Sequence, residues 1–302
     1  MITISRKNIF EIVNNSFDLS RELSRMKRLF EEEDTVEVGA WVYTSILNYV
    51  DSSGFSEWKN RGRCVDADDF LSLLRYETLW DTASTNPDDF FTLVELIYNF
   101  WYITDRQTCA SKTLDEYGRN FVLLKTIMDD CLAHYGYKGK YFCDCEQLIV
   151  IEDKPEATAV AEIVSPEHSP KVLRYNHFTL KGDLQAKKSI LIALGSELEP
   201  KRQQLRRIDS SLEDDIFFML NNLHIRHNNK TADDKYYRQV VADMDNSTLE
   251  HWYDELYQMM LLAYLQLDQV DRSEKVRELK QTVSQKIGSS NAGNTASTHP
   301  HR

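Results

Sequence analysis

The stretch that decides the fold is residues 247–267, STLEHWYDELYQMMLLAYLQL. Its apolar residues recur every three or four positions, which is the spacing of one face of an α-helix. They are Trp252, Tyr253, Leu256, Tyr257, Met260, Leu261, Tyr264 and Leu267. Ser247 and Glu250 have the spacing of a capping box, so we predict that a long amphipathic helix begins at this point.

Helical periodicity extends over most of the chain, and a shorter region breaks it. The further predicted helices are 6–33, 36–50, 70–79, 90–102, 114–134, 184–198 and 210–224. Glycine and proline cluster between residues 136 and 182, around short apolar runs at 148–151 and 172–175, which we predict to be strands. A turn of helix is expected between these runs, at 156–164.

We therefore expect a mainly α fold in which two helical lobes are joined by a small β-containing connector. The expected parts are an N-terminal helical lobe at 1–137, an α/β connector at 138–182, a C-terminal helical lobe at 183–287 and a disordered tail at 288–302. The tail is expected to be disordered because it contains almost no residues that a core could bury.

Composition limits the classes of function. Hydrophobic residues make up 42% of the 302 residues, as in a folded globular protein. The net charge of −12 opposes general binding to DNA. Five cysteines are an odd number, and no signal-peptide pattern opens the sequence, so we expect a cytoplasmic protein. No apolar run is long enough to suggest a membrane span.

Polar and basic residues crowd the stretch 221–230, NNLHIRHNNK, at the end of a predicted helix. Arginine offers a planar cation for phosphate, histidine exchanges a proton near neutral pH, and asparagine can orient either group. These are the parts of a metal-independent ribonuclease site. The candidate catalytic residues are Arg226, His227, His224, Asn222 and Asn228. The same residue types also bind the last carbonyls of a helix, which is the structural alternative.

The C-terminal third of the chain resembles the HEPN proteins, many of which act in bacterial abortive infection or as toxins. The resemblance covers residues 175–268. It rests on Asn176-His177-Phe178, Lys181-Gly182-Asp183, Leu198-Glu199-Pro200-Lys201-Arg202 and Ile225-Arg226-His227-Asn228-Asn229. It implies an antiphage effector that acts as an endoribonuclease on RNA, and a homodimer that brings together two copies of Arg226 and His227.

The same stretch leaves a second reading open. Thr231, Ala232 and Asp233 stand where the HEPN pattern has a histidine. The alternative is therefore a non-catalytic helical interaction or sensor protein of a defence system, with a protein partner.

A second constellation has the residue types of a zinc site. Its members are Cys131, His134, Cys143 and Cys145. The first two lie three positions apart on one helix face, and the last two share a strand face, so all four could converge on a structural Zn²⁺. The alternative is that Cys131 is a core residue, His134 caps its helix and the last two are partly exposed.

Overall fold

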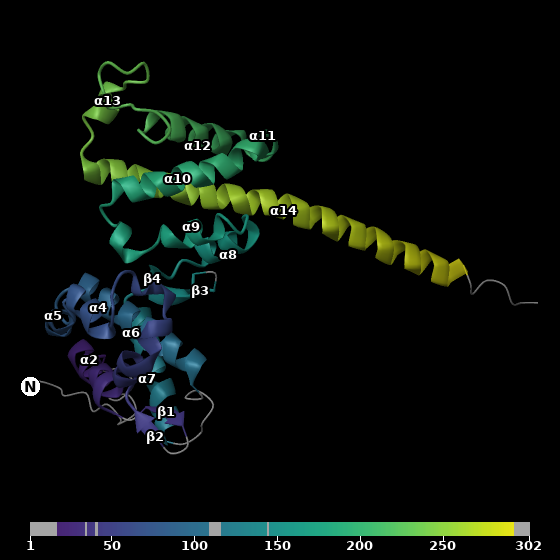
Figure 1. Cartoon of the computed structure of the whole chain (residues 1–302). Coiled ribbons are helices and arrows are strands. Elements are labelled where there is room, and N and C mark those ends of the chain that lie inside the picture. Colours follow the sequence, from purple (N-terminus) through teal and green to yellow (C-terminus); the bar gives the residue numbers. More distant parts are fainter. Residues whose placement is uncertain (1–16, 34, 40–41, 109–115, 144, 293–302) are drawn as a thin grey trace, which may run out of the picture. The chain divides into compact units, whose positions relative to one another are not determined.

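The computed structural model describes residues 17–33, 35–39, 42–108, 116–143 and 145–292. As the sequence predicts, the fold is mainly α-helical, with two small antiparallel sheets of two strands each in the described part (Figure 1). The chain divides into two compact units. The N-terminal unit contains Met1–Asp153 and Asn176–Thr179, and the C-terminal unit contains Lys154–Tyr175 and Leu180–Arg302. No described helix has the length and continuous apolar character that a bilayer span requires.

The N-terminal unit is organised around α6 (Pro87–Gln107). Asn86 caps this helix by accepting a hydrogen bond from the N–H of Asp88, and Pro87 occupies the first turn, where proline favours a helix start. The helix predicted at 90–102 therefore begins three residues earlier and ends five residues later. Its buried residues form the centre of the core of this unit. The unit also contains α2 (Leu19–Lys27), η1 (Arg28–Glu32), β1 (Val36–Gly39), β2 (Val42–Thr44), α3 (Ile46–Tyr49), η2 (Val50–Gly54), η3 (Phe55–Glu57), η4 (Lys59–Arg61), α4 (Ala67–Leu73), α5 (Tyr76–Thr82), α7 (Glu116–His134), β3 (Tyr137–Phe142) and β4 (Gln147–Glu152).

The predicted helix at 36–50 is wrong over most of its length. The chain instead forms the β1–β2 hairpin, with Val36 paired to Thr44, and only then the short helix α3. Two properties of the segment explain the difference. Valine and threonine, branched at Cβ, favour the pleated strand, and Val36, Glu37 and Val38 alternate with the period of a strand. The predicted helix at 6–33 is observed at α2 and η1, while residues 1–16 lie outside the described residues.

The predicted connector is divided between the two units. The run 148–151 is a strand, as predicted, and it lies in β4. Its partner is β3, which the sequence did not predict, in a register that pairs Tyr137 with Glu152. The run 172–175 is not a strand, because most of it lies in the helix α9 (Ser169–Arg174), where Pro170 in the first turn favours a helix start. The predicted helical turn at 156–164 is confirmed as α8 (Pro155–Ile163).

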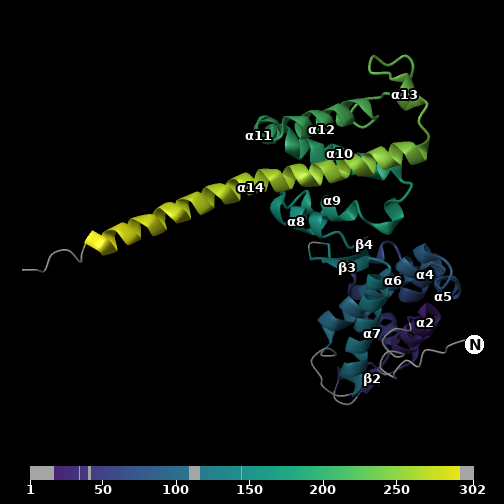
Figure 2. The ribbon, with the colours of Figure 1, turned by 180° about the vertical axis from the view of Figure 1, so that it is seen from behind.

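The C-terminal unit packs several helices against the first half of α14 (Asn246–Ala292). Its other elements are α8, α9, α10 (Leu184–Leu198), η7 (Glu199–Lys201), α11 (Arg202–Ile208), α12 (Ser210–Asn222) and α13 (Gln239–Ala242), and η6 (Phe178–Leu180) lies where the two units meet in the sequence. Figures 1 and 2 both show α10, α11 and α12 along this half of α14. Leu256, Tyr257 and Met260 of α14 are completely or almost completely buried there, which confirms the helix predicted from 247–267.

At both capping-box spacings in this unit, Ser210 with Glu213 and Ser247 with Glu250, the capping residue is instead the aspartate that precedes the serine or lies two positions before it. The side chain of Asp209 accepts the hydrogen bond from Leu212 at the start of α12, and that of Asp245 accepts from Thr248 at the start of α14. The two glutamates of the predicted boxes have other partners. Glu213 is buried between Arg202 and Arg206, and Glu250 forms an ion pair with Lys187 at 2.7 Å.

The second half of α14 leaves the body of its own unit (Figure 2). Every side chain from residue 271 to residue 283 is exposed. The helix continues to Ala292, so the first residues of the predicted tail are helical, and residues 293–302 lie outside the described residues.

Candidate functional site

The polar stretch 221–230 forms the end of α12 and the loop that follows it in the C-terminal unit. The helix ends at Asn222, and His224 has a φ of 58°, a left-handed conformation that reverses the direction of the chain. The N–H of Arg226 then turns back to the carbonyl of Leu220 at 2.9 Å. The loop is therefore folded onto the end of its own helix.

Asn229 lies at the centre of this loop and is completely buried. Its side-chain oxygen accepts a hydrogen bond from the N–H of His224 at 2.7 Å. Its side-chain nitrogen donates to the carbonyls of Asn221 at 3.3 Å and Tyr236 at 2.7 Å. One amide thus binds three points of the backbone, two before it and one after it in the sequence. The sequence did not single out this residue as a candidate.

His224 is held by the same neighbour. Its ring nitrogen Nδ1 accepts a hydrogen bond from the N–H of Asn229 at 3.3 Å. Burial lowers the pKa of His224, and the positive charges of Lys188 and Lys230 lower it further. The imidazole is therefore neutral at neutral pH, with Nδ1 as an acceptor.

Arg226 is engaged within the unit. Its Nη1 forms an ion pair with Glu199 at 2.7 Å, and its Nη2 donates to the carbonyl of Gly195 at 3.1 Å. The guanidinium also lies over the ring of Phe217, 5.4 Å from the ring centre. Arg226 therefore fastens the loop to α10 and α12, and a phosphate would have to compete with Glu199 for it.

The remaining three candidates also have local partners. The ring of His227 stacks on Tyr236 at 3.8 Å between ring centres. Asn222 donates to the carbonyl of Phe218 at 2.9 Å, and Asn228 accepts hydrogen bonds from the backbone of Lys230 and Thr231. In the described part of the chain, no hydrogen bond or ion pair joins Arg226 to either histidine. The contacts are those of an ordered loop.

The four candidate zinc ligands are in different surroundings. Cys131 is buried in α7, and burial, with the nearby charges of Glu22 and Asp130, raises the pKa of its thiol to about 12. The ring of His134 stacks on Phe17 at 3.8 Å. Cys143 is exposed, while the thiol of Cys145 points to the carbonyl of Phe142 at 3.9 Å. Over the residues that the structure describes, no three His, Cys, Asp or Glu side chains come close enough to hold a metal.

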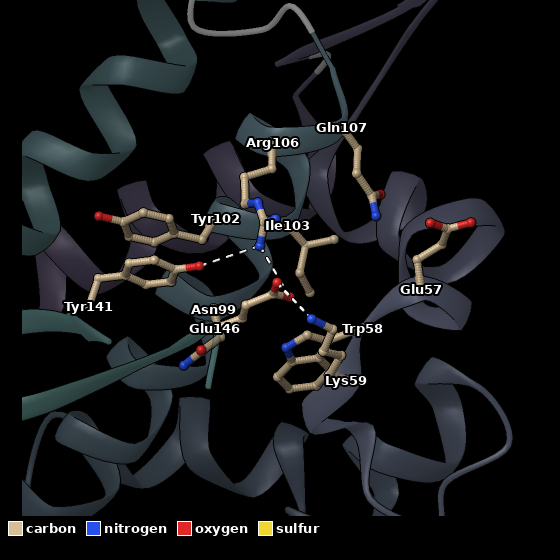
Figure 3. A pocket seen from close by; sticks show the side chains of 10 residues that line it. All are labelled: Glu57, Trp58, Lys59, Asn99, Tyr102, Ile103, Arg106, Gln107, Tyr141 and Glu146. Atoms are coloured by element: carbon tan, nitrogen blue, oxygen red, sulfur yellow. Dashed lines mark hydrogen bonds and ion pairs between the residues drawn. The ribbon is translucent and has the colours of Figure 1, made fainter. Parts of the chain in front are cut away.

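Sequence reasoning missed an ion cluster beside a cavity in the N-terminal unit (Figure 3). Its charged side chains include Lys59, Arg106 and Glu146, which are far apart in the sequence. No motif connects them. The one local signal is that Glu146 follows two cysteines in a tight hairpin turn, and it did not point to a cavity.

This chain matches no family model, no curated protein sequence and no solved structure. The HEPN resemblance therefore stays a prediction from the residues that carry it. The evidence on the function of the loop at 221–230 is the set of contacts that its own residues make.

Proposed function

We propose that this protein is a non-catalytic interaction protein that forms a homodimer through the exposed half of α14. The observation that carries the proposal is the exposure of every side chain from 271 to 283 in a helix that is continuous with the core of its unit. An isolated helix gains little stability in water without packing against another surface. A partner along this segment would supply that packing.

The exposed segment carries an apolar stripe. Val276, Leu279 and Val283 are 48%, 61% and 49% exposed, and they are spaced by three and four residues. This is the spacing of the positions that face a partner helix in a coiled coil. Of the three stripe residues, only Val276 lines a hollow of the helix surface. The stripe is therefore an exposed apolar strip that the apolar face of another helix could cover.

Charges beside the stripe favour one direction for a second copy. With Val276 and Val283 in equivalent heptad positions, Lys275 and Lys280 flank the seam on opposite sides. Two parallel copies would place these lysines against one another across the seam, which is unfavourable. An antiparallel pair avoids this contact.

The test is the mass of the protein in solution. Light scattering after size exclusion, at several concentrations, is expected to give twice the chain mass of 35.3 kDa. Leu279→Glu places a charge in the stripe and is expected to weaken the dimer at least about tenfold, or ~1.4 kcal/mol. Gln281→Glu adds the same charge on another face and should leave the dimer intact. A wild-type monomer at every concentration, or a dimer that tolerates Leu279→Glu, would contradict the proposal.

A second candidate is the metal-independent ribonuclease that the HEPN resemblance implies. One observation favours it: His224 is neutral at neutral pH and close to the positive charges of Lys188 and Lys230. A neutral imidazole beside cations has the properties of a general base at a phosphate-binding surface, once its Nδ1 is released from the N–H of Asn229. The ion pair between Arg226 and Glu199 opposes it, because Arg226 would have to leave its partner to bind RNA. The antiphage role, the RNA substrate and the cytoplasmic location belong to this proposal.

The ribonuclease candidate is tested by induction in a bacterial host. Growth and total RNA integrity are compared for the wild type, Arg226→Ala, His224→Ala and His227→Ala. Arg207→Ala, which removes an exposed arginine of α11, is the matched control. RNA cleavage that the control retains and Arg226→Ala loses would support the ribonuclease. Intact RNA and normal growth with the wild type would leave the interaction protein as the function.

A further inference from the structure

A cavity of about 350 Å³ opens in the N-terminal unit beside the last turns of α6 (Figure 3). Its other walls come from η3 and η4 and from the β3–β4 hairpin. The volume lies at the lower end of the range for small-molecule sites. More of the lining is polar than apolar, which suits a small polar ligand.

One end of the cavity is positively charged. Lys59 and Arg106 both bind the carboxylate of Glu146, at 2.9 and 3.1 Å. Two cations therefore share one anion. Both side chains are more than half exposed, and a lysine has three N–H donors and an arginine five. Donors remain for a second anion at this end.

The backbone of the hairpin turn is fixed around this cluster. Glu146 has a φ of 52°, a conformation in which glycine or asparagine is more usual. The side-chain nitrogen of Asn60 donates to the carbonyls of Cys145 and Glu146, both at 2.9 Å. Hydrogen bonds from Lys59 and Arg106 hold the pKa of Glu146 below its usual value. Backbone strain of this kind is common where a protein positions a ligand.

The other end of the cavity is negatively charged. Figure 3 shows Glu57 and Gln107 on the side opposite the Glu146 carboxylate, with Ile103 between the two ends. Within the described part of the chain, Glu57 has no ion-pair partner. The side-chain oxygen of Gln107 accepts a hydrogen bond from Tyr49 at 3.1 Å, which leaves its NH₂ group for a ligand.

We infer that this cavity binds a small zwitterion whose ammonium and carboxylate groups are separated by a short carbon chain, as in an ω-amino acid. The carboxylate of the ligand meets Arg106 and Lys59, and its ammonium group meets Glu57. Opposite charges at separate ends of one small cavity match this class better than a simple anion, which Glu57 would repel. Ile103 offers an apolar surface for the carbon chain of the ligand. The inference does not depend on the proposed homodimer.

Isothermal titration of the full chain with β-alanine, 4-aminobutyrate, 6-aminohexanoate and each of the twenty L-amino acids tests the inference. At least one is expected to bind with a Kd below about 1 mM. Arg106→Gln and Glu57→Gln are each expected to weaken that binding at least about tenfold. Lys138→Gln is the matched control, because it removes a lysine that pairs with Asp153 at 2.7 Å in the same unit. Circular dichroism establishes that each variant is folded.

Two simpler probes separate the ends of the cavity. Propionate carries the carboxylate alone and propylamine the ammonium group alone, and each is expected to bind more weakly than the amino acid. Propionate that binds as tightly as the amino acid, with Glu57→Gln unaffected, would overturn the zwitterion assignment. Failure of all of these amino acids to bind the wild type would overturn it as well, and so would equal binding to Arg106→Gln.

Discussion

Replacing Asn229 by alanine should cost more stability than any other single change in the polar loop. The residue is completely buried, and its side chain makes three hydrogen bonds to the backbone of the loop and of α12. Each such bond contributes about 0.5–1.5 kcal/mol net, and the loss leaves backbone groups without their partner. We expect Asn229→Ala to lower the free energy of unfolding by about 2–4 kcal/mol. That is a large part of the ~5–15 kcal/mol typical of a domain.

The neighbouring asparagine is the matched control. Asn228 is exposed, and its side-chain oxygen accepts only from the nearby backbone of Lys230 and Thr231. Asn228→Ala should therefore cost about 1 kcal/mol or less. The two variants remove the same chemical group at adjacent positions, so the difference between them measures burial and long-range bonding.

Urea unfolding followed by circular dichroism measures the free energy of unfolding of each variant. Hydrogen exchange with mass spectrometry gives the local effect, which should appear as faster exchange in the peptides covering residues 223–238. Equal stability of the two variants, with unchanged exchange in this loop, would refute the reasoning. It would mean that the stability of the loop at 221–230 does not depend on the buried amide of Asn229. The polar residues of the loop would then be better explained by a chemical role than by a structural one.

Three further outcomes follow from the same structure. Tyr264→Phe removes a buried hydrogen bond of 2.8 Å from the tyrosine hydroxyl to the carbonyl of Leu194. This change should lower the free energy of unfolding by about 1 kcal/mol, as measured by urea unfolding, and Tyr237→Phe is the control. The pKa of His224 in the folded protein lies below its ordinary value of 6.5, so the unfolded chain binds the proton more readily. The contribution of the neutral His224 to the free energy of unfolding is therefore complete above pH ~6.5, and it is lost as the pH falls through the folded pKa. His224→Asn should be less sensitive to this fall when urea midpoints are compared above pH ~6.5 and well below it, and an equal loss in both proteins would contradict the assignment. Cys143 should be alkylated by iodoacetamide well before Cys131, since one thiol is exposed and burial raises the pKa of the other to about 12, and peptide mass spectrometry gives the order.

The sequence predicted the elements whose apolar residues keep one period. The first half of α14 belongs to this group, because a single buried face repeats over several turns. Helix α6, of which residues 90–102 were predicted, is buried on most of its sides instead. The segment 36–50 was misread because it is apolar at many successive positions, which gives no clear period. Strand β3 was missed for the opposite reason: its middle residues are only partly buried, so no apolar run marks it.

The candidate site shows a different limit. The unusual density of polar residues at 221–230 was visible in the sequence, and so were both of its explanations. The choice between them depends on which groups meet after the loop closes. Asn229 reaches Tyr236, and Arg226 reaches Glu199 on another element, and neither contact leaves a periodic signal. The cavity near Glu146 was invisible because its residues come from three separate segments.

The continuity of α14 fixes the rotational phase between the core of its unit and the apolar stripe. Neither glycine nor proline interrupts the helix between residues 246 and 287. Val283 lies about 24 Å along the axis from Leu267, which is the last buried residue among those whose side chains the structure describes. Each residue advances the helix by roughly 100° about its axis. A one-residue insertion between Leu267 and Val283 would therefore rotate the apolar stripe by the same angle relative to the core of the unit. An insertion of about seven residues, or two turns, would restore the direction while lengthening the arm. The length of this segment therefore determines where a bound partner would be held, independently of what the partner contacts.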